Sequence, residues 1–428
     1  MMHRTPLHWF YLLPALVLAT LAKVPADEPT TAFPYTVTDE TKDRELSAAM
    51  RRSFEHYPAP RLEDNELYSQ FKYTPLKGFD YHGGDGTVSR RDATKVVREN
   101  GRYYVWYTHR STPTPPKGPD KCTDTIPSTD WDLAEIWYAT SDDGFTWTEQ
   151  GVAVPRPTKP NPGWRSVATP GVLKFKDKFY LYYQAFSEPS MTRGDYCPIS
   201  VSFADSVDGP WTPANTETVP TGKPGEWDQY AVQDPNPLVH NGKVYLYYKS
   251  AFNRPHALWV AQGLAIADNP LGPFIKHSLN PVMNSSHEVA LFPFRKGVAC
   301  LSIRDGQEHF TVQYAEDWIN FEIASITELM PVAAGPYVPD AFTDSGDGRG
   351  ITWGISHFKN ATRNWSHQHS ILTRFDCDLS LDVDDPEMKK SHIDYRPEHH
   401  YQFGLSNKQR ERIERENRQL RSEDQKTP

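Results

Sequence analysis

The chain has 428 residues, which is more than one ordinary domain holds unless the fold is a repeat. Its formal net charge is −9 and no basic run precedes the C-terminal tail. This excludes nucleic acid as a partner, because phosphate binding needs clustered Lys and Arg. Aromatic residues make up 13 % of the chain and prolines number 37, which is typical of short twisted strands joined by tight turns.

Residues 1–26 form a targeting signal at the N-terminus. A short basic start with His3 and Arg4 precedes an apolar run over 9–22 that is too short to span a bilayer comfortably. We therefore expect a periplasmic or secreted protein with no membrane partner. Four cysteines are too few for a disulfide scaffold, although Cys122 and Cys197 lie in loop-like segments that could pair.

Residues 27–77 form a small N-terminal helical segment. Apolar residues recur at i, i+4 and i+8 over 44–57, which predicts one helix, and a second short helix is expected over 63–71. Two short helices cannot bury much surface by themselves. The segment must therefore dock, either on the rest of its own chain or on a second subunit as a dimerisation element.

Residues 78–380 predict an all-β fold, a five-bladed β-propeller. Five aromatic or apolar strands begin near residues 103, 179, 244, 298 and 351, so they recur every 53 to 76 residues (351 − 298 and 179 − 103). A recurrence of this length with four strands per repeat is typical of propeller blades, and we take these five as the inner strands. The stretch 140–147 matches an Asp box, a structural hairpin turn. Residues 381–428 form a charged tail, read as a solvated helix or disorder.

A polar residue precedes the turn of each of these strands by eight or nine positions. The five are Asp92, Thr169, Asp234, Glu288 and Asp340. Equivalent positions of different blades converge around one pit at the propeller axis. The second of them offers only a hydroxyl and the last precedes a strand that is less aromatic, so Asp92, Asp234 and Glu288 are the candidate catalytic acids. Three carboxylates in one pit should raise at least one pKa, as glycoside hydrolysis requires.

Other residues near these positions have two readings. His287 directly precedes Glu288 and either supports it or acts as the general acid itself. Asp85 competes with Asp92, but its glycine-rich turn favours a turn aspartate. The candidates for substrate binding are Arg91, Trp131, Trp164, Thr169, Gln184, Arg254 and His256, and for the two tryptophans core packing is the default reading.

Several blades resemble one known family at the same time. The segments RRDATKVV, QDPNPLVHNGKVYLYYKS and SHEVALFPFRKGV, with the N-terminal YSQFKYTPLKGF, look like glycoside hydrolase family 117 from about residue 40 to residue 380. The resemblance implies a homodimer that exchanges the N-terminal helical segment. It also implies an α-1,3-(3,6-anhydro)-L-galactosidase, which releases 3,6-anhydro-L-galactose with inversion from the non-reducing end of neoagarobiose and neoagaro-oligosaccharides.

The resemblance also implies a role for each acid. Asp92 would be the general base that activates water, and Asp234 would tune the pKa values and orient the sugar. The acid role falls to Glu288 or His287, between which the residues do not decide. No cofactor is required, although a divalent cation near the propeller axis is compatible with the family. Ala93 follows Asp92 where a proline is usual, so we expect a looser turn there.

Two alternatives remain beside this reading. Propeller glycosidases that act on arabinose, xylose or fructose units use the same layout of three acids. A non-catalytic propeller that binds carbohydrate is the alternative from another class. The three acids argue against it, because binding alone does not call for three converging carboxylates.

Overall fold

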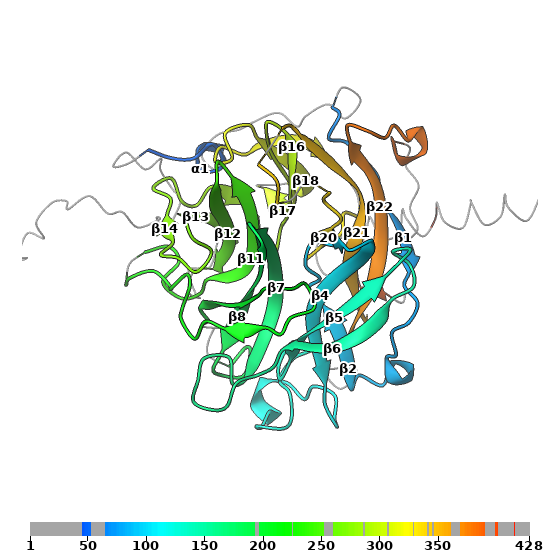
Figure 1. Cartoon of the computed structure of the whole chain (residues 1–428), viewed down its shortest axis with the longest axis vertical. Helices are drawn as coiled ribbons and strands as arrows, with labels where there is room; N and C mark the ends of the chain where they lie inside the picture. The colour runs from blue at the N-terminus through cyan, green and yellow to red at the C-terminus, as the bar shows by residue number, and fades with distance from the viewer. Residues whose placement is uncertain are drawn as a thin grey trace, which may run out of the picture.

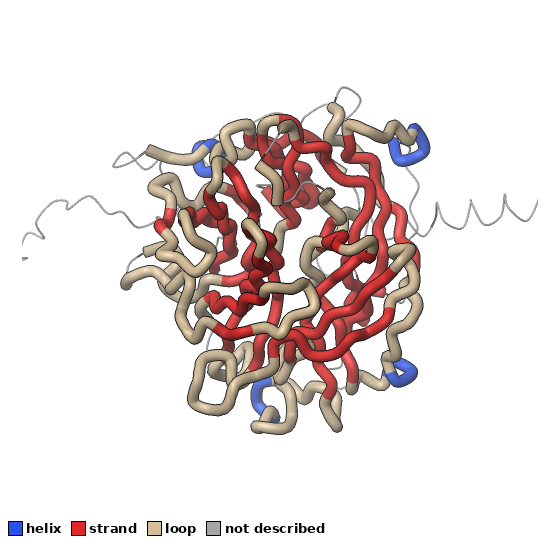
Figure 2. The backbone as a smooth tube through the Cα atoms, in the orientation of Figure 1, coloured by secondary structure: helices blue, strands red, loops and turns tan. Residues whose placement is uncertain are grey.

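The computed structural model describes residues 45–52, 65–192, 197–224, 226–251, 260–285, 287–305, 308–327, 329–339, 342–344, 346–360, 369–389, 399–400 and 415. These residues form an all-β, five-bladed β-propeller with a small N-terminal helical segment, α1 (Ala48–Arg52). The strands are arranged around a common centre (Figures 1 and 2). Short 3₁₀ turns lie at His82–Gly84, Pro119–Lys121 and Pro386–Lys389.

The first three blades are separate antiparallel sheets. Blade one consists of β2 (Val88–Arg91), β3 (Val97–Glu99), β4 (Arg102–Ser111), β5 (Glu135–Ser141) and β6 (Thr148–Val154). Blade two consists of β7 (Ser166–Phe175), β8 (Lys178–Phe186), β9 (Ile199–Ala204) and β10 (Thr212–Pro213). Blade three consists of β11 (Gln233–His240), β12 (Lys243–Ala251), β13 (Val260–Ala267), β14 (Ile275–Lys276) and β15 (Met283–Asn284).

Blades four and five are joined, because β16 also pairs with β21. Blade four consists of β16 (Ala290–Arg295), β17 (Gly297–Asp305), β18 (Glu308–Ala315) and β19 (Glu322–Ile326). Blade five consists of β20 (Gly335–Pro336), β21 (Gly348–Asn360), β22 (Ser370–Ser380), β1 (Lys72–Pro75) and β23 (His399–His400). The N-terminal strand β1 pairs with the late strand β22 (Figure 1), so the two ends of the propeller meet in one blade and close the ring.

The aromatic strands β4, β8, β12, β17 and β21 lie second in their blades, so the prediction that they are innermost is wrong. The innermost strands of blades two, three and four are β7, β11 and β16, and β7 contacts β11 directly. These strands contain Pro170, Pro235, Pro237 and Pro293, which weaken the strand signal in the sequence. Proline is tolerated there because an edge strand leaves one side of its backbone unpaired.

The core fills the space between neighbouring blades. One cluster joins blades four and five through Phe292, Phe294 and Phe375, and another joins blades two and three through Tyr182 and Tyr248. Burial of such aromatic side chains is the main stabilising term of each interface between blades. The ring is therefore rigid where the inner strands begin, which is where precise geometry matters for a site.

The helix α1 docks on the propeller of its own chain. Its face adds Leu46 and Met50 to the core of blades two and three. Ser47 Oγ donates to the Pro281 carbonyl at 2.7 Å, and Arg52 Nη2 lies 2.7 Å from Asp305 Oδ2 of blade four. Within the described residues the helix predicted over 44–57 is present as Ala48–Arg52. The exchange of this segment in a dimer stays a prediction.

The second predicted helix, over 63–71, is wrong for its described part. Residues 65–71 form a turn that leads into β1, and Asn65 Oδ1 accepts a hydrogen bond from the Leu67 amide at 2.8 Å. Such a side-chain bond offers the backbone an alternative to the helical pattern. The signal over 1–26 and most of the tail lie outside the described residues. No helix among the described residues is long and apolar enough to cross a membrane.

Two smaller predictions have clear outcomes. Cys122 and Cys197 do not pair, and all four cysteines are free thiols. The Asp box is a hairpin turn as expected, with Gly144 at φ 73° and Trp147 buried beneath it. Its turn carboxylate is Asp143, which accepts the amides of Phe145 and Thr146 at 2.7 Å each. The spacing of the motif indicates the preceding residue, Asp142, which is exposed.

Candidate active site

The same backbone irregularity recurs at the pit position of the first three blades. Asp92, Thr169 and Asp234 have φ values of 52°, 48° and 53°, which is the left-handed region. The strand pairing skips Thr169 in β7 and Asp234 in β11. Left-handed backbone at residues other than glycine costs about 1–3 kcal/mol and persists where the surroundings hold it. Asp92 adopts it without the proline of the other two, so Ala93 does not change the turn.

Asp92 is buried and held from three sides. Its Oδ2 accepts hydrogen bonds from Arg91 Nε at 2.8 Å, Thr169 Oγ1 at 3.3 Å and Thr108 Oγ1 at 3.4 Å. His357 Nδ1 lies 3.7 Å from Oδ1 and accepts the Asp92 amide at 3.2 Å. Among the described residues, Oδ1 accepts no hydrogen bond. One carboxylate oxygen is thus fixed, and the other remains available to a ligand or a water.

Asp234 lies at the equivalent position of blade three and shares a lysine with Glu288. Gln184 Nε2 donates to Asp234 Oδ1, and Lys249 Nζ forms an ion pair with Asp234 Oδ2. The same Lys249 Nζ lies 4.0 Å from Glu288 Oε1. Burial raises the pKa of Asp234, the charge of Lys249 opposes that shift, and the charge of Asp92 adds to it. The three acids therefore lie in one electrostatic environment, as the blade alignment predicts.

His287 and Glu288 are neighbours in space as well as in sequence. His287 Nδ1 is in contact with Glu288 Oε2, although successive residues of a strand point to opposite faces. The backbone is not a strand here, and the His287 carbonyl accepts Ser285 Oγ at 2.8 Å and Gln262 Nε2 at 2.9 Å. Burial lowers the pKa of His287 well below its ordinary value, with Lys249 adding to the shift. The imidazole is therefore uncharged at neutral pH. We call Asp92, Thr169, Asp234, His287 and Glu288 the pit.

Arg91 connects the pit to Trp131. Besides Asp92, its guanidinium binds Asp130 Oδ1 at 2.8 Å and lies 4.8 Å from the centre of the Trp131 ring. Burial opposes the charged form of Arg91, but Asp130 and Asp92 together raise its pKa. Its neighbour Arg90 points the other way and pairs with Glu149 at 2.7 Å, which is a structural ion pair. Alternation along β2 thus sends one arginine to the pit and one away from it.

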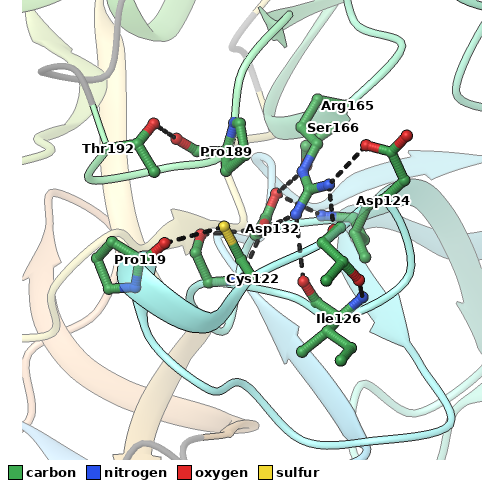
Figure 3. A network of polar contacts seen from close by, with 12 residues as sticks. Pro119, Cys122, Asp124, Ile126, Asp132, Arg165, Ser166, Pro189 and Thr192 are labelled. Atoms are coloured by element: carbon green, nitrogen blue, oxygen red, sulfur yellow. Dashed lines mark hydrogen bonds and ion pairs between the residues drawn. The ribbon is translucent and has the colours of Figure 1, made fainter.

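A buried ion pair anchors the loop that carries Trp131 (Figure 3). Arg165 binds both carboxylate oxygens of Asp132, with Nε 2.7 Å from Oδ1 and Nη2 2.6 Å from Oδ2. Its Nη1 also donates to the Thr123 carbonyl at 2.6 Å. The next residue, Ser166, donates its hydroxyl to the Trp131 carbonyl at 2.7 Å. The long loop of blade one is therefore fastened to the start of β7.

The remaining candidates divide into three groups. Trp164 lies beneath Lys159, whose Nζ is 4.2 Å from the ring centre, and no contact joins it to the pit within the described residues. Asp85 is an exposed turn aspartate that accepts the Thr87 amide at 2.8 Å, as its glycine-rich context indicates. Arg254, His256 and Asp340 lie outside the described residues.

Sequence reasoning missed several residues that contact the pit. They are Thr108, Asp130, Lys249, His357 and Lys359. Three second-strand residues share one register: Thr108, Gln184 and Lys249 each face the residue that precedes a pit residue. Only Gln184 was predicted, and an alignment of the second strands would have found the other two.

The described residues do not form a ready metal site. No group of three or more His, Cys, Asp or Glu side chains among them is arranged to hold an ion. The pit carboxylates are instead paired with Arg91 and Lys249. A divalent cation near the axis thus stays a prediction, and we derive no step through one.

Comparisons with known proteins agree with this geometry. The family model described as glycosyl hydrolases family 43 matches residues 125–269. Among solved structures, Zg3597, a family 117 glycoside hydrolase produced by the marine bacterium Zobellia galactanivorans, is 62 % identical with a TM-score of 0.74. That alignment covers 78 % of this chain and 98 % of Zg3597.

More distant structures share the fold alone. A structure described as a glycoside hydrolase is 12 % identical with a TM-score of 0.50, over 73 % of this chain and 92 % of its own. A complex described by the names BT0996 and RGII is 11 % identical with a TM-score of 0.51, over 72 % and 92 %. No match is found among curated proteins. On the identity and coverage shared with Zg3597, the chain is a glycoside hydrolase that belongs to family 117.

Proposed function

We propose that the protein is an exo-acting, inverting α-1,3-(3,6-anhydro)-L-galactosidase. It releases 3,6-anhydro-L-galactose from the non-reducing end of neoagarobiose and neoagaro-oligosaccharides. Membership of family 117 supports the reaction class. The observation that carries the proposal is the pit itself, in which Lys249 bridges Asp234 and Glu288 while Thr169 links blade two to Asp92. An inverting glycosidase needs a base and an acid held on opposite sides of the sugar.

In this mechanism Asp92 is the general base. Its Oδ2 is held by Arg91, Thr108 and Thr169, while Oδ1 accepts no hydrogen bond among the described residues. Oδ1 takes a proton from the attacking water as the water oxygen bonds to the anomeric carbon. The three fixed contacts keep the carboxylate from rotating, which preserves the geometry of attack.

The general acid is the contacting pair of His287 and Glu288. As the glycosidic C–O bond breaks, the leaving oxygen takes one proton from this pair. The lowered pKa of His287 leaves the imidazole uncharged, so the proton is shared with the carboxyl group of Glu288. Solvent then returns a proton to the pair and removes the one that Asp92 has taken, so the cycle closes.

Asp234 and the residues around Trp131 bind and orient the sugar. Gln184 and Lys249 hold Asp234, whose raised pKa allows a protonated carboxyl to donate to a sugar hydroxyl. Trp131, with Arg91 beside its ring, offers an aromatic surface for the apolar face of a sugar. These groups favour binding of one terminal unit, which fits exo action.

Incubation with neoagarobiose and neoagarotetraose tests the proposal. Chromatography should detect free 3,6-anhydro-L-galactose together with galactose from the disaccharide, and NMR of the first product should show the inverted anomer. Arabinosides, xylosides and fructosides belong in the same panel. Release from one of these without release from neoagarobiose would instead support the second reading, a propeller glycosidase for other units.

We also propose that the protein is periplasmic or secreted and that it acts as a homodimer. The basic and apolar start of the chain supports export. The small helical segment before the propeller supports a dimerisation element. Light scattering on the full chain without residues 1–26 should give twice the chain mass, and a monomer at micromolar concentration would refute the dimer.

A further inference from the structure

Lys95 is a buried lysine that the proposed mechanism does not use. It lies three residues after Asp92, and only 5 % of its surface is exposed. Its Nζ donates to Asn236 Oδ1 and lies 3.4 Å from the Pro237 carbonyl. Both partners belong to β11 of blade three, so one side chain of blade one reaches across the centre of the propeller.

Asn236 carries the connection on to blade four. It lies two residues after Asp234, and its Nδ2 donates to the Val289 carbonyl at 2.9 Å. Val289 in turn directly follows Glu288. The hydrogen bonds thus run from blade one through blade three to blade four, and in each blade they touch the chain one to three residues after a pit acid.

The neighbouring blades pack directly against one another around this chain of contacts. A Cβ on Gly335 of blade five would lie 1.7 Å from the Thr94 carbonyl oxygen of blade one. A Cβ on Gly171 of blade two would lie 2.2 Å from the Pro235 carbonyl oxygen of blade three. Backbone contact therefore sets the spacing of these two pairs of blades, whereas blades one, three and four are joined by polar side chains.

Such a buried amine is costly to keep. Burial lowers the pKa of Lys95 to about 7, so the amine is only partly protonated near neutral pH. Both the charged and the neutral amine can donate an N–H to Asn236. An apolar side chain of the same length would avoid the desolvation cost altogether. Lys95 thus supplies something that simple packing would not.

We propose that Lys95 is a positioning residue, which sets the spacing between Asp92, Asp234 and the pair of His287 and Glu288 by fastening three strand starts together through Asn236. This rests on the proposed function of the pit. Each acid is only one to three residues from its anchor, so a shift of an anchor moves the carboxylate nearly as far. A displacement of about 1 Å can cost a hundredfold in rate.

The test uses Lys95→Met, Asn236→Ala and the double variant, with Lys174→Met as the matched control. Lys174 pairs with Glu99 on the outside of the propeller and is remote from the pit. We expect Lys95→Met and Asn236→Ala each to lower kcat about tenfold to a hundredfold, with KM within about twofold. The double variant should be no slower than the slower single variant, and Lys174→Met should match the parent.

Two results would overturn the proposal. One is a kcat for Lys95→Met within about twofold of the parent, and the other is losses that multiply in the double variant, which would mean independent effects. If the parent hydrolyses no neoagaro-sugar, the proposed function fails, and the crystal structure of Lys95→Met decides this question instead. A displaced Asp234 relative to Asp92 supports positioning, whereas superimposable pits, or a change in melting temperature alone, refute it.

Discussion

Replacing Arg165 by methionine should destabilise the protein by about 4 kcal/mol, because it breaks a buried ion pair. Arg165 and Asp132 are both fully buried and joined by two hydrogen bonds. Removing one partner of such a pair costs about 3–5 kcal/mol, since the remaining charge is left uncompensated. The loop carbonyls that lose a donor can be reached by water once the loop loosens, so they add about 1 kcal/mol at most.

Guanidinium chloride unfolding followed by tryptophan fluorescence measures this loss of unfolding free energy. The matched control is Arg349→Met, since Arg349 pairs with Asp382 at the surface and exposed pairs contribute about 0–1 kcal/mol. The variant Arg165→Met with Asp132→Leu should recover much of the stability, because no buried charge remains.

A cost for Arg165→Met no larger than that of Arg349→Met would refute this reasoning. So would a double variant whose cost equals the sum of the two single costs, because the two residues would then not act as a pair.

The remaining predictions concern binding, metal and pH. Trp131→Ala should raise KM about tenfold with a smaller change in kcat, as expected for a lost stacking surface of about 1–1.5 kcal/mol; an unchanged KM in steady-state assays would exclude the platform. Dialysis against EDTA should leave hydrolysis unchanged, because Arg91 and Lys249 already pair with the pit acids, and a loss reversed by added calcium would contradict this. The amides of Thr146 and Phe145 lower the pKa of Asp143 to about 2. The stability it contributes is therefore present above its unfolded pKa and lost as pH falls toward 2, so Asp143→Asn should narrow the difference in melting temperature between pH 7 and pH 2.

The blade count and the pit could be predicted because both depend on a repeat. Aromatic second strands recur with the blades, and each acid precedes its strand by a nearly constant number of residues. Asp92, Asp234 and Glu288 therefore fall into one pit whichever strand is innermost. The strand order itself was missed, because prolines such as Pro235 mark an edge strand and look like loop residues.

Residues that depend on register or on local backbone could not be read from the sequence. Lys249 and Thr108 reach the acids only because β12 and β4 pair with the preceding strands at particular positions. The contact of His287 with Glu288 needs a stretch that is not a strand, which no residue type announces. Asp143 rather than its neighbour accepts the turn amides for the same kind of reason.

Hydrolysis of neoagarobiose by Asp92→Asn, measured beside Asp85→Asn, tests the central claim most directly. Both changes remove one carboxylate charge from blade one, but only Asp92 lies in the pit, whereas Asp85 is an exposed turn residue. A general base contributes about 10²–10⁴-fold, so Asp92→Asn should lose at least a hundredfold while Asp85→Asn keeps the activity of the parent. Substantial activity in Asp92→Asn, or its loss in Asp85→Asn, would contradict the assignment of the pit as the active site.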